Sequence, residues 1–145
     1  MVDVNKLRIN NIVHIIDNCL SECFKIYKIT DQSSYLCVDS NGNEYPWYIE
    51  KYEIDYIGLS SEILLNKCNF ILYEHDVYKR TVYFDVGVYR LLINIDRFFI
   101  SHYKCEFKDR SVIGDKVRGN FNIKYLHQLQ NLYFYLTGKE LAINL

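Results

Sequence analysis

The sequence predicts an α+β fold, in which a small N-terminal β-barrel is followed by a short helix and an antiparallel β-meander packed by a C-terminal helix. Three observations predict it. Short alternating apolar segments separated by turn residues fill residues 1–58. Further alternating segments follow residue 70, and one stretch near the C-terminus has apolar residues at helical spacing. We therefore expect a barrel subdomain at 1–58, and a second part at 59–145 in which the short helix, the meander and the C-terminal helix share one core.

The composition suits this fold class. Half of the 145 residues are hydrophobic and 24% are charged, which is the balance of a globular protein. The aromatic content is unusual, with 14 Tyr and 8 Phe against a single Trp. Tyr and Phe, together with Ile and Val, favour pleated and half-buried surfaces, so the composition favours strands.

Five segments of the N-terminal part are expected to be strands. The pair Asn41-Gly42 supplies the positive φ angles that a tight hairpin turn needs. Pro46 cannot donate a ladder hydrogen bond, so it marks an edge strand or the start of a strand. Five short strands with tight turns predict a strongly curved, SH3-like barrel. The segments are KLRINNIVHII (6–16, with a break near Asn10-Asn11), CFKIYKIT (23–30), YLCVD (35–39), EYPWYI (44–49) and KYEIDYIGL (51–59).

A short helix is predicted over about 61–68, with Ser60 as its N-cap and Asn69 as a left-handed terminus. It could cover the barrel or link the two halves. Residues 108–120 are polar and contain Gly114 and Gly119, so they are the longest predicted loop. Three segments between the helix and this loop are predicted to form the meander, namely YKRTVYFDV (78–86), YRLLINI (89–95) and RFFISHYKCEF (97–107).

The C-terminal helix is predicted from Leu126, Leu129, Tyr133 and Leu136, which fall on one helical face, and Gly138 lies where a helix-ending glycine belongs. The segment ELAINL (140–145) can add a short strand. Four polar residues lie mostly off the apolar stripe, and we expect them to bond to neighbouring backbone or to form an interface. They are His127, Gln128, Gln130 and Asn131.

Charge and hydropathy exclude several classes of function. The net charge is −1 and the pI is near 6.4, so no global basic field attracts nucleic acid or an anionic membrane. Charged residues interrupt the apolar runs well short of the roughly 20 residues that a membrane span needs. The N-terminus lacks the pattern of a signal peptide, and we expect a cytoplasmic protein.

No pattern indicates catalysis or metal binding. The five cysteines are an odd number without a C-x-x-C pair, so we expect free thiols. The four histidines lack metal-ligand spacing, and the glycine-rich phosphate loops and the nucleophile elbow are missing from the sequence. Cysteine–histidine catalysis would depend on spatial pairing that sequence does not reveal. We therefore expect no cofactor, no metal and no enzyme activity.

The aromatic clusters are the best candidates for binding. Aromatic faces beside Lys or Arg can stack a nucleotide ring, but the same residues can be barrel core or rim, or a protein interface. In the first meander strand, alternation would place Tyr78, Arg80 and Val82 on one face. The candidate ligand-binding residues are Tyr45, Trp47, Tyr48, Lys51, Tyr78, Arg80, Arg90, Lys116 and Arg118.

Three segments resemble a family of small uncharacterised proteins from Bacteroidota genomes, prophages and mobile elements. LRINNIV resembles its L-R-I-G-N-x-V opening, and GLSSEILLNKCNF resembles its L-T-P-E-I-L-x-K-C-G-F segment. IKYLHQLQNLYFYLTGKEL resembles its K-Y-V-H-Q-L-Q-N-L-Y-F-A-L-T-G-E-E-L ending. Residues 71–120 show no such match. The resemblance implies a phage or mobile-element origin and carries over no functional residue.

Together these points predict a non-enzymatic accessory protein that acts by binding in the cytoplasm of a host bacterium. In one version it is an anti-defence sponge that sequesters a host immune nucleotide, as a homo-oligomer with the ligand at the subunit interface. The alternative is an interaction module that inhibits a host defence or transcription complex. A nucleic-acid-binding barrel is a third reading, which the net charge disfavours.

Overall fold

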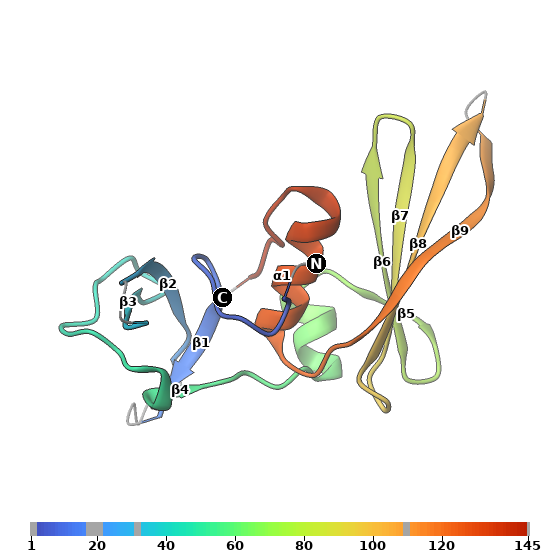
Figure 1. Ribbon diagram of the computed structural model, residues 1–145. Coiled ribbons are helices and arrows are strands. Elements are labelled where there is room, and N and C mark those ends of the chain that lie inside the picture. The colour runs from blue at the N-terminus through green and yellow to red at the C-terminus, as the bar shows by residue number, and fades with distance from the viewer. Residues whose placement is uncertain (1–2, 17–21, 31–32, 109–110, 145) are drawn as a thin grey trace. The chain divides into compact units, whose positions relative to one another are not determined.

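The computed structural model describes residues 3–16, 22–30, 33–108 and 111–144, and the side chains of 108 and 111–119 lie outside this description. The chain divides into two compact units, which are described separately below (Figure 1). The first comprises Met1–Gly58 and Tyr125–Leu141, and the second comprises Leu59–Lys124 with Ala142–Asn144. The boundary after Gly58 coincides with the one expected from sequence, but the C-terminal helix belongs to the first unit.

The first unit contains an antiparallel sheet of four strands in the order β3-β2-β1-β4. Within the described residues these strands form no closed barrel. The segment 44–49 is not a continuous strand, because it meets β3 only at the isolated bridges Val38–Glu44 and Tyr35–Ile49. Pro46 lies between these bridges and has no N–H to donate. The elements are β1 (Ile12–Ile15), β2 (Phe24–Ile29), β3 (Tyr35–Val38), the 3-10 helix η1 (Lys51–Glu53) and β4 (Ile54–Asp55).

Three further local predictions in this unit are wrong. The segment 51–59 is not one strand, because Lys51–Glu53 form the 3-10 helix η1 and β4 covers only Ile54–Asp55. Residues 6–11 are not part of the first strand, because the chain turns at Asn10, whose φ is 75°, and β1 begins only at Ile12. In the turn after β3, Gly42 alone of the predicted pair has positive φ, at 84°. The backbone N–H groups of Asn41 and Asn43 instead donate to the side chain of Asp39, which organises this turn.

Alternation along the strands builds the core of the first unit. Val13, Phe24, Ile26 and Cys37 are buried on successive strands. Burial raises the pKa of the Cys37 thiol to about 11, so this residue acts as a small hydrophobe. The same cluster includes Leu7, Ile15, Tyr35, Ile49 and Ile54.

The second unit begins with the predicted helix. Its central part is the π-helix η2 (Ile63–Lys67), in which the N–H of Cys68 donates to the carbonyl of Ile63. The hydroxyl of Ser60 accepts from the N–H of Ile63 at 3.2 Å, and Asn69 has a φ of 58°. Both predicted ends of the helix are therefore confirmed. Leu64 and Cys68 are fully buried on its inner side.

A five-stranded antiparallel meander in the order β5-β6-β7-β8-β9 follows, which confirms the predicted meander and the α+β class (Figure 1). The predicted loop at 108–120 is wrong, because β9 pairs with β8 along almost all of this segment. β9 is an edge strand, where polar residues are tolerated, and two register shifts interrupt its pairing. The strands are β5 (Ile71–Glu74), β6 (Val77–Phe84), β7 (Gly87–Asn94), β8 (Phe99–Lys108) and β9 (Ser111–Asn122).

The C-terminal helix α1 (Leu126–Thr137) is confirmed, and Gly138 ends it with a φ of 71°. Its stripe is buried at Leu126, Leu129 and Tyr133. The predicted strand after it is wrong, because residues 139–144 have no strand pairing. Near its end, the N–H of Asn144 donates to the carbonyl of Lys67. None of the helices in the described residues could span a lipid bilayer.

Candidate functional site

The polar residues of α1 hold the N-terminal segment in place. The side chain of Gln130 accepts from the N–H of Ile12 and donates to the carbonyl of Asn10, both at 2.9 Å. The amide of Gln128 donates to the side chain of Asn5 at 2.6 Å. These bonds confirm the expectation that the polar residues of the helix bond to neighbouring backbone, and they make residues 4–12 a fixed wall beside α1.

Asn131 is the centre of this network. Its amide nitrogen donates to the carbonyls of Val4 and Lys6, at 2.9 and 2.8 Å. Its side-chain oxygen accepts from the amide of Asn11, which in turn accepts from the N–H of Arg8. Asn11 and Asn131 are both buried, and each uses its side-chain oxygen and its side-chain nitrogen on protein partners.

Arg8 leaves this segment toward the end of α1. Its guanidinium donates to both carboxylate oxygens of Glu140, at 2.6 and 2.8 Å, and lies 4.4 Å from the ring centre of Phe134. The same group donates to the carbonyls of Ile9 and Gln130. The hydrogen bonds from Arg8 lower the pKa of Glu140 below its ordinary value, so the pair is charged at neutral pH.

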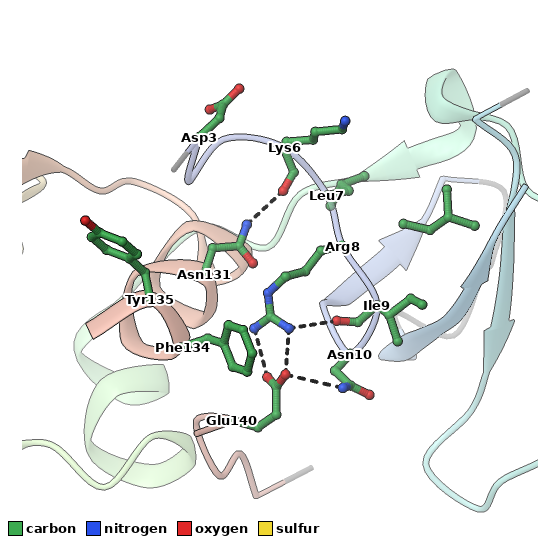
Figure 2. Close-up of a pocket in the computed structure, with 11 residues that line it drawn as sticks. Asp3, Lys6, Leu7, Arg8, Ile9, Asn10, Asn131, Phe134, Tyr135 and Glu140 are labelled. Carbon is green, nitrogen blue, oxygen red and sulfur yellow. Dashed lines mark hydrogen bonds and ion pairs between the residues drawn. The ribbon is translucent and has the colours of Figure 1, made fainter. Parts of the chain in front are cut away.

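A pocket of about 980 Å³ opens beside this ion pair, entirely within the first unit. Figure 2 shows Glu140 and the ring of Phe134 both against the guanidinium of Arg8, with Tyr135 on the same helix. Phe134 and Tyr135 are 41% and 53% exposed, so both side chains are accessible from solvent. Lys6 and Asp3 are exposed at the rim.

The charges of the pocket balance. Lys6 and Arg8 are the cations, and Asp3 and Glu140 are the anions. Arg8 already uses both terminal nitrogens on protein acceptors, whereas Lys6 has no ion-pair partner among the described residues. The pocket can therefore offer one cation and two rings to a ligand, and it has no excess positive charge for a polyanion.

The candidate residues of the first unit lie outside this pocket. The ring of Tyr45 contacts those of Phe24 and Trp47 edge-on, each at 5.5 Å between ring centres, and it packs against the core as a rim residue. Trp47 and Tyr48 are 60% and 53% exposed, and Lys51 is also exposed. These three side chains are accessible, and their role in binding stays a prediction.

Among the candidates of the second unit, those with described side chains do not converge. β6 and β7 pair without a register shift, so the predicted face of Tyr78, Arg80 and Val82 is confirmed. Tyr78 is buried, and Arg80 donates to the carbonyl of Cys68 at 2.5 Å. Arg90 lies opposite Thr81, which places it on the other face of the sheet from Arg80. Lys116 and Arg118 lie in β9, outside the described side chains.

Sequence reasoning missed the pocket because its walls are 120 to 132 residues apart along the chain. The family resemblance did point to these residues, since Arg8 lies in the N-terminal segment LRINNIV and Glu140 lies in the C-terminal segment IKYLHQLQNLYFYLTGKEL. Among the described residues, no group of three or more His, Cys, Asp and Glu is placed to hold a metal ion. Comparisons of the chain with protein-family models, with curated proteins and with solved structures found no match.

Proposed function

We propose that this protein is a non-enzymatic binding protein whose pocket beside Arg8 takes a small ligand with an aromatic ring and one anionic group, of the nucleoside monophosphate or cyclic mononucleotide class. The observation that carries the proposal is the pocket itself. Its volume of about 980 Å³ lies at the upper end of the range for small-molecule sites. A base would stack on the exposed ring of Tyr135, and a phosphate would pair with Lys6.

The charge balance narrows the ligand. Because two carboxylates offset the two cations of the pocket, a ligand with three phosphates meets repulsion from Asp3 and Glu140. In the phage or mobile-element setting that the resemblance implies, such a protein would sequester a host immune nucleotide. The pocket lies within one unit of one chain, so this binding needs no subunit interface, and a homo-oligomer is a separate proposal.

A thermal-shift screen tests the proposal, because a ligand that binds only the folded state raises the melting temperature. We expect shifts with nucleoside monophosphates and cyclic mononucleotides, and smaller shifts with triphosphates. Tyr135→Ala should weaken binding about fivefold or more, since stacking on one ring contributes about 1–3 kcal/mol. Tyr52→Ala is the matched control, because Tyr52 is 79% exposed and lies outside the pocket. The absence of any shift across the panel, with a folded protein, would exclude this function.

A second candidate is an interaction module that binds a host protein through Trp47, Tyr48 and Tyr52. These side chains are 60%, 53% and 79% exposed within one short segment, and Tyr and Trp are enriched at the centres of protein interfaces. If this reading holds, one host protein copurifies with the wild type and is lost with Trp47→Ala/Tyr48→Ala. Tyr83→Ala, which removes a side chain 71% exposed in the second unit, should keep it. Salt-sensitive retention of the protein on nucleic acid would instead favour a nucleic-acid-binding function.

The pairing in the first unit supports the finer proposal of an SH3-like arrangement. The segment 44–49, β3, β2, β1 and β4 lie in consecutive pairing. Only Glu50 and the 3-10 helix η1 separate the last residue of that segment from β4. The two ends of the pairing order, segment 44–49 and β4, are therefore close together along the chain. The same relationship is expected in a small, strongly curved barrel.

A further inference from the structure

Three side chains form a row across the sheet of the first unit. The register of β1 with β2 pairs Ile12 with Lys25 and Val13 with Phe24, so His14 lies opposite Cys23 as the next pair. On its other side, His14 is the direct partner of Asp55 in β4. Directly opposed residues of antiparallel strands point to the same face, so the three side chains are neighbours.

The distance from the Cys23 sulfur to Nε2 of His14 is 3.6 Å, which is within hydrogen-bonding range for sulfur. Cys23 and His14 are half-buried, and Asp55 is exposed. This is the spatial pairing of a cysteine with a histidine that activates thiol nucleophiles, with a carboxylate beside the histidine. From this row we propose that Cys23 is a nucleophilic thiol activated by His14, and that it undergoes reversible exchange with low-molecular-weight disulfides.

The other described cysteines contrast with Cys23. Cys37, Cys68 and Cys105 are 0% exposed, and none of the four is in a disulfide. Burial raises the pKa of the Cys68 thiol to about 12 and that of Cys37 to about 11. A disulfide reagent in solution therefore has no access to these three thiols, and they serve as internal controls within the same molecule.

Charged residues of both neighbouring strands lie on the face that carries His14. Lys25 of β2 lies two positions from Cys23, on the same face. Asp55 of β4 is the direct partner of His14, and the side chain of the preceding acidic residue, Glu53, accepts from the N–H of Glu50. Along the chain, the flanking positions of the face are the apolar Ile12 of β1 and Ile16, which directly follows β1.

The exchange step balances without an external oxidant. The thiol proton of Cys23 passes to Nε2 of His14, and the thiolate attacks one sulfur of the disulfide R–S–S–R. The R–S–S–R bond breaks, a mixed disulfide forms between Cys23 and one R–S group, and the second R–S⁻ leaves and takes the proton from His14. Excess thiol reverses the step by the same route.

Alkylation of the full-length protein tests the proposal. The protein is treated with excess iodoacetamide between pH 6 and 9, and the rate at each cysteine is read by peptide mass spectrometry. We expect Cys23 to react at pH 7 about tenfold faster than the same residue in urea-unfolded protein, with its rate midpoint at lower pH. His14→Gln should remove this advantage, Asp55→Asn should reduce it, and His75→Gln, at a side chain that is 96% exposed, should leave it unchanged.

Exchange itself is read by incubation with cystamine, which should add one reagent half to Cys23 and release it on treatment with dithiothreitol. Cys23→Ser should abolish that adduct. The comparison of native with urea-unfolded wild type decides the question even if a variant fails to fold. A rate at Cys23 equal to or below that in urea would overturn the proposal, as would a folded His14→Gln variant that reacts like the wild type.

Discussion

The side-chain amide of Asn11 donates to the side-chain oxygen of Asn131 at 2.9 Å, and both residues are buried. The bond joins the turn before β1 to the middle of α1. Asn131 also bonds to the carbonyls of Val4 and Lys6, so one side chain satisfies three polar groups of the N-terminal segment. The wall of the pocket beside Arg8 depends on this residue.

Asn131→Ala should therefore destabilise the protein by about 3 kcal/mol, because it leaves several buried polar groups without partners. Asn66→Ala is the control, since Asn66 is exposed and should change stability by less than about 0.5 kcal/mol. Urea unfolding measures both. A double-mutant cycle with Asn11→Ala should show coupling, and strictly additive effects would contradict a shared network.

The ion pair of Arg8 with Glu140 should make stability depend on acid pH. The hydrogen bonds from Arg8 lower the folded-state pKa of Glu140 below 4.5, so its stabilising effect is complete above that value and is lost as pH falls through the lowered pKa. At pH 7 the free energy of unfolding of the wild type should exceed that of Glu140→Gln by at most about 1 kcal/mol, since more than a third of the Glu140 side chain is exposed. The difference should vanish near pH 2, whereas Glu74→Gln, an exposed control, should show none.

His127 should add a second pH dependence, in the neutral range. It is buried against the rings of Tyr56 and Tyr125, and burial lowers its pKa below the ordinary 6.5. Below pH 6.5 the unfolded chain binds a proton at this histidine more readily than the folded chain does. The contribution of His127 to stability is therefore full above pH 6.5 and is lost as the pH falls through the lowered pKa. Chemical unfolding at pH 7.5 and pH 5.5 should show this loss.

The matched variants for this prediction are His127→Phe and His75→Gln. The first keeps a ring beside the two tyrosines but cannot be protonated, so it should lose the pH dependence whatever its absolute stability. The second changes a histidine whose side chain is 96% exposed, and this variant should keep the pH dependence of the wild type. An unchanged slope in His127→Phe would assign the pH dependence to another group.

Gly87→Ala should be strongly destabilising. A Cβ at this buried position of β7 would lie 1.9 Å from the carbonyl oxygen of Cys105 in the neighbouring strand. The strands would have to separate, at a cost of about 1–3 kcal/mol or more. Gly58→Ala is the control, because an added Cβ there meets nothing within 4 Å. Thermal unfolding should separate the two variants clearly, and similar melting temperatures would contradict the close approach.

Local chemistry carried much of the fold prediction. Alternation identified β2, β3, β6, β7 and β8, because strands half-buried on one face require period two. Ser60, Asn69 and Gly138 marked helix ends correctly, because the geometry of a cap is set within a few residues. The same reasoning failed for the polar segment 108–120, which was predicted as a loop and lies largely in β9. An edge strand needs little apolar surface, so its sequence can resemble that of a loop.

The sequence by itself determined the α+β class, the strand-rich composition, and the helix with its buried stripe and polar flank. Only the tertiary structure decided which unit the helix joins, where the pocket lies, and that Cys23 stands beside His14. Periodicity records the neighbours of a residue along one element. Contacts such as Arg8 with Glu140 depend on how separate elements meet, which no local pattern contains.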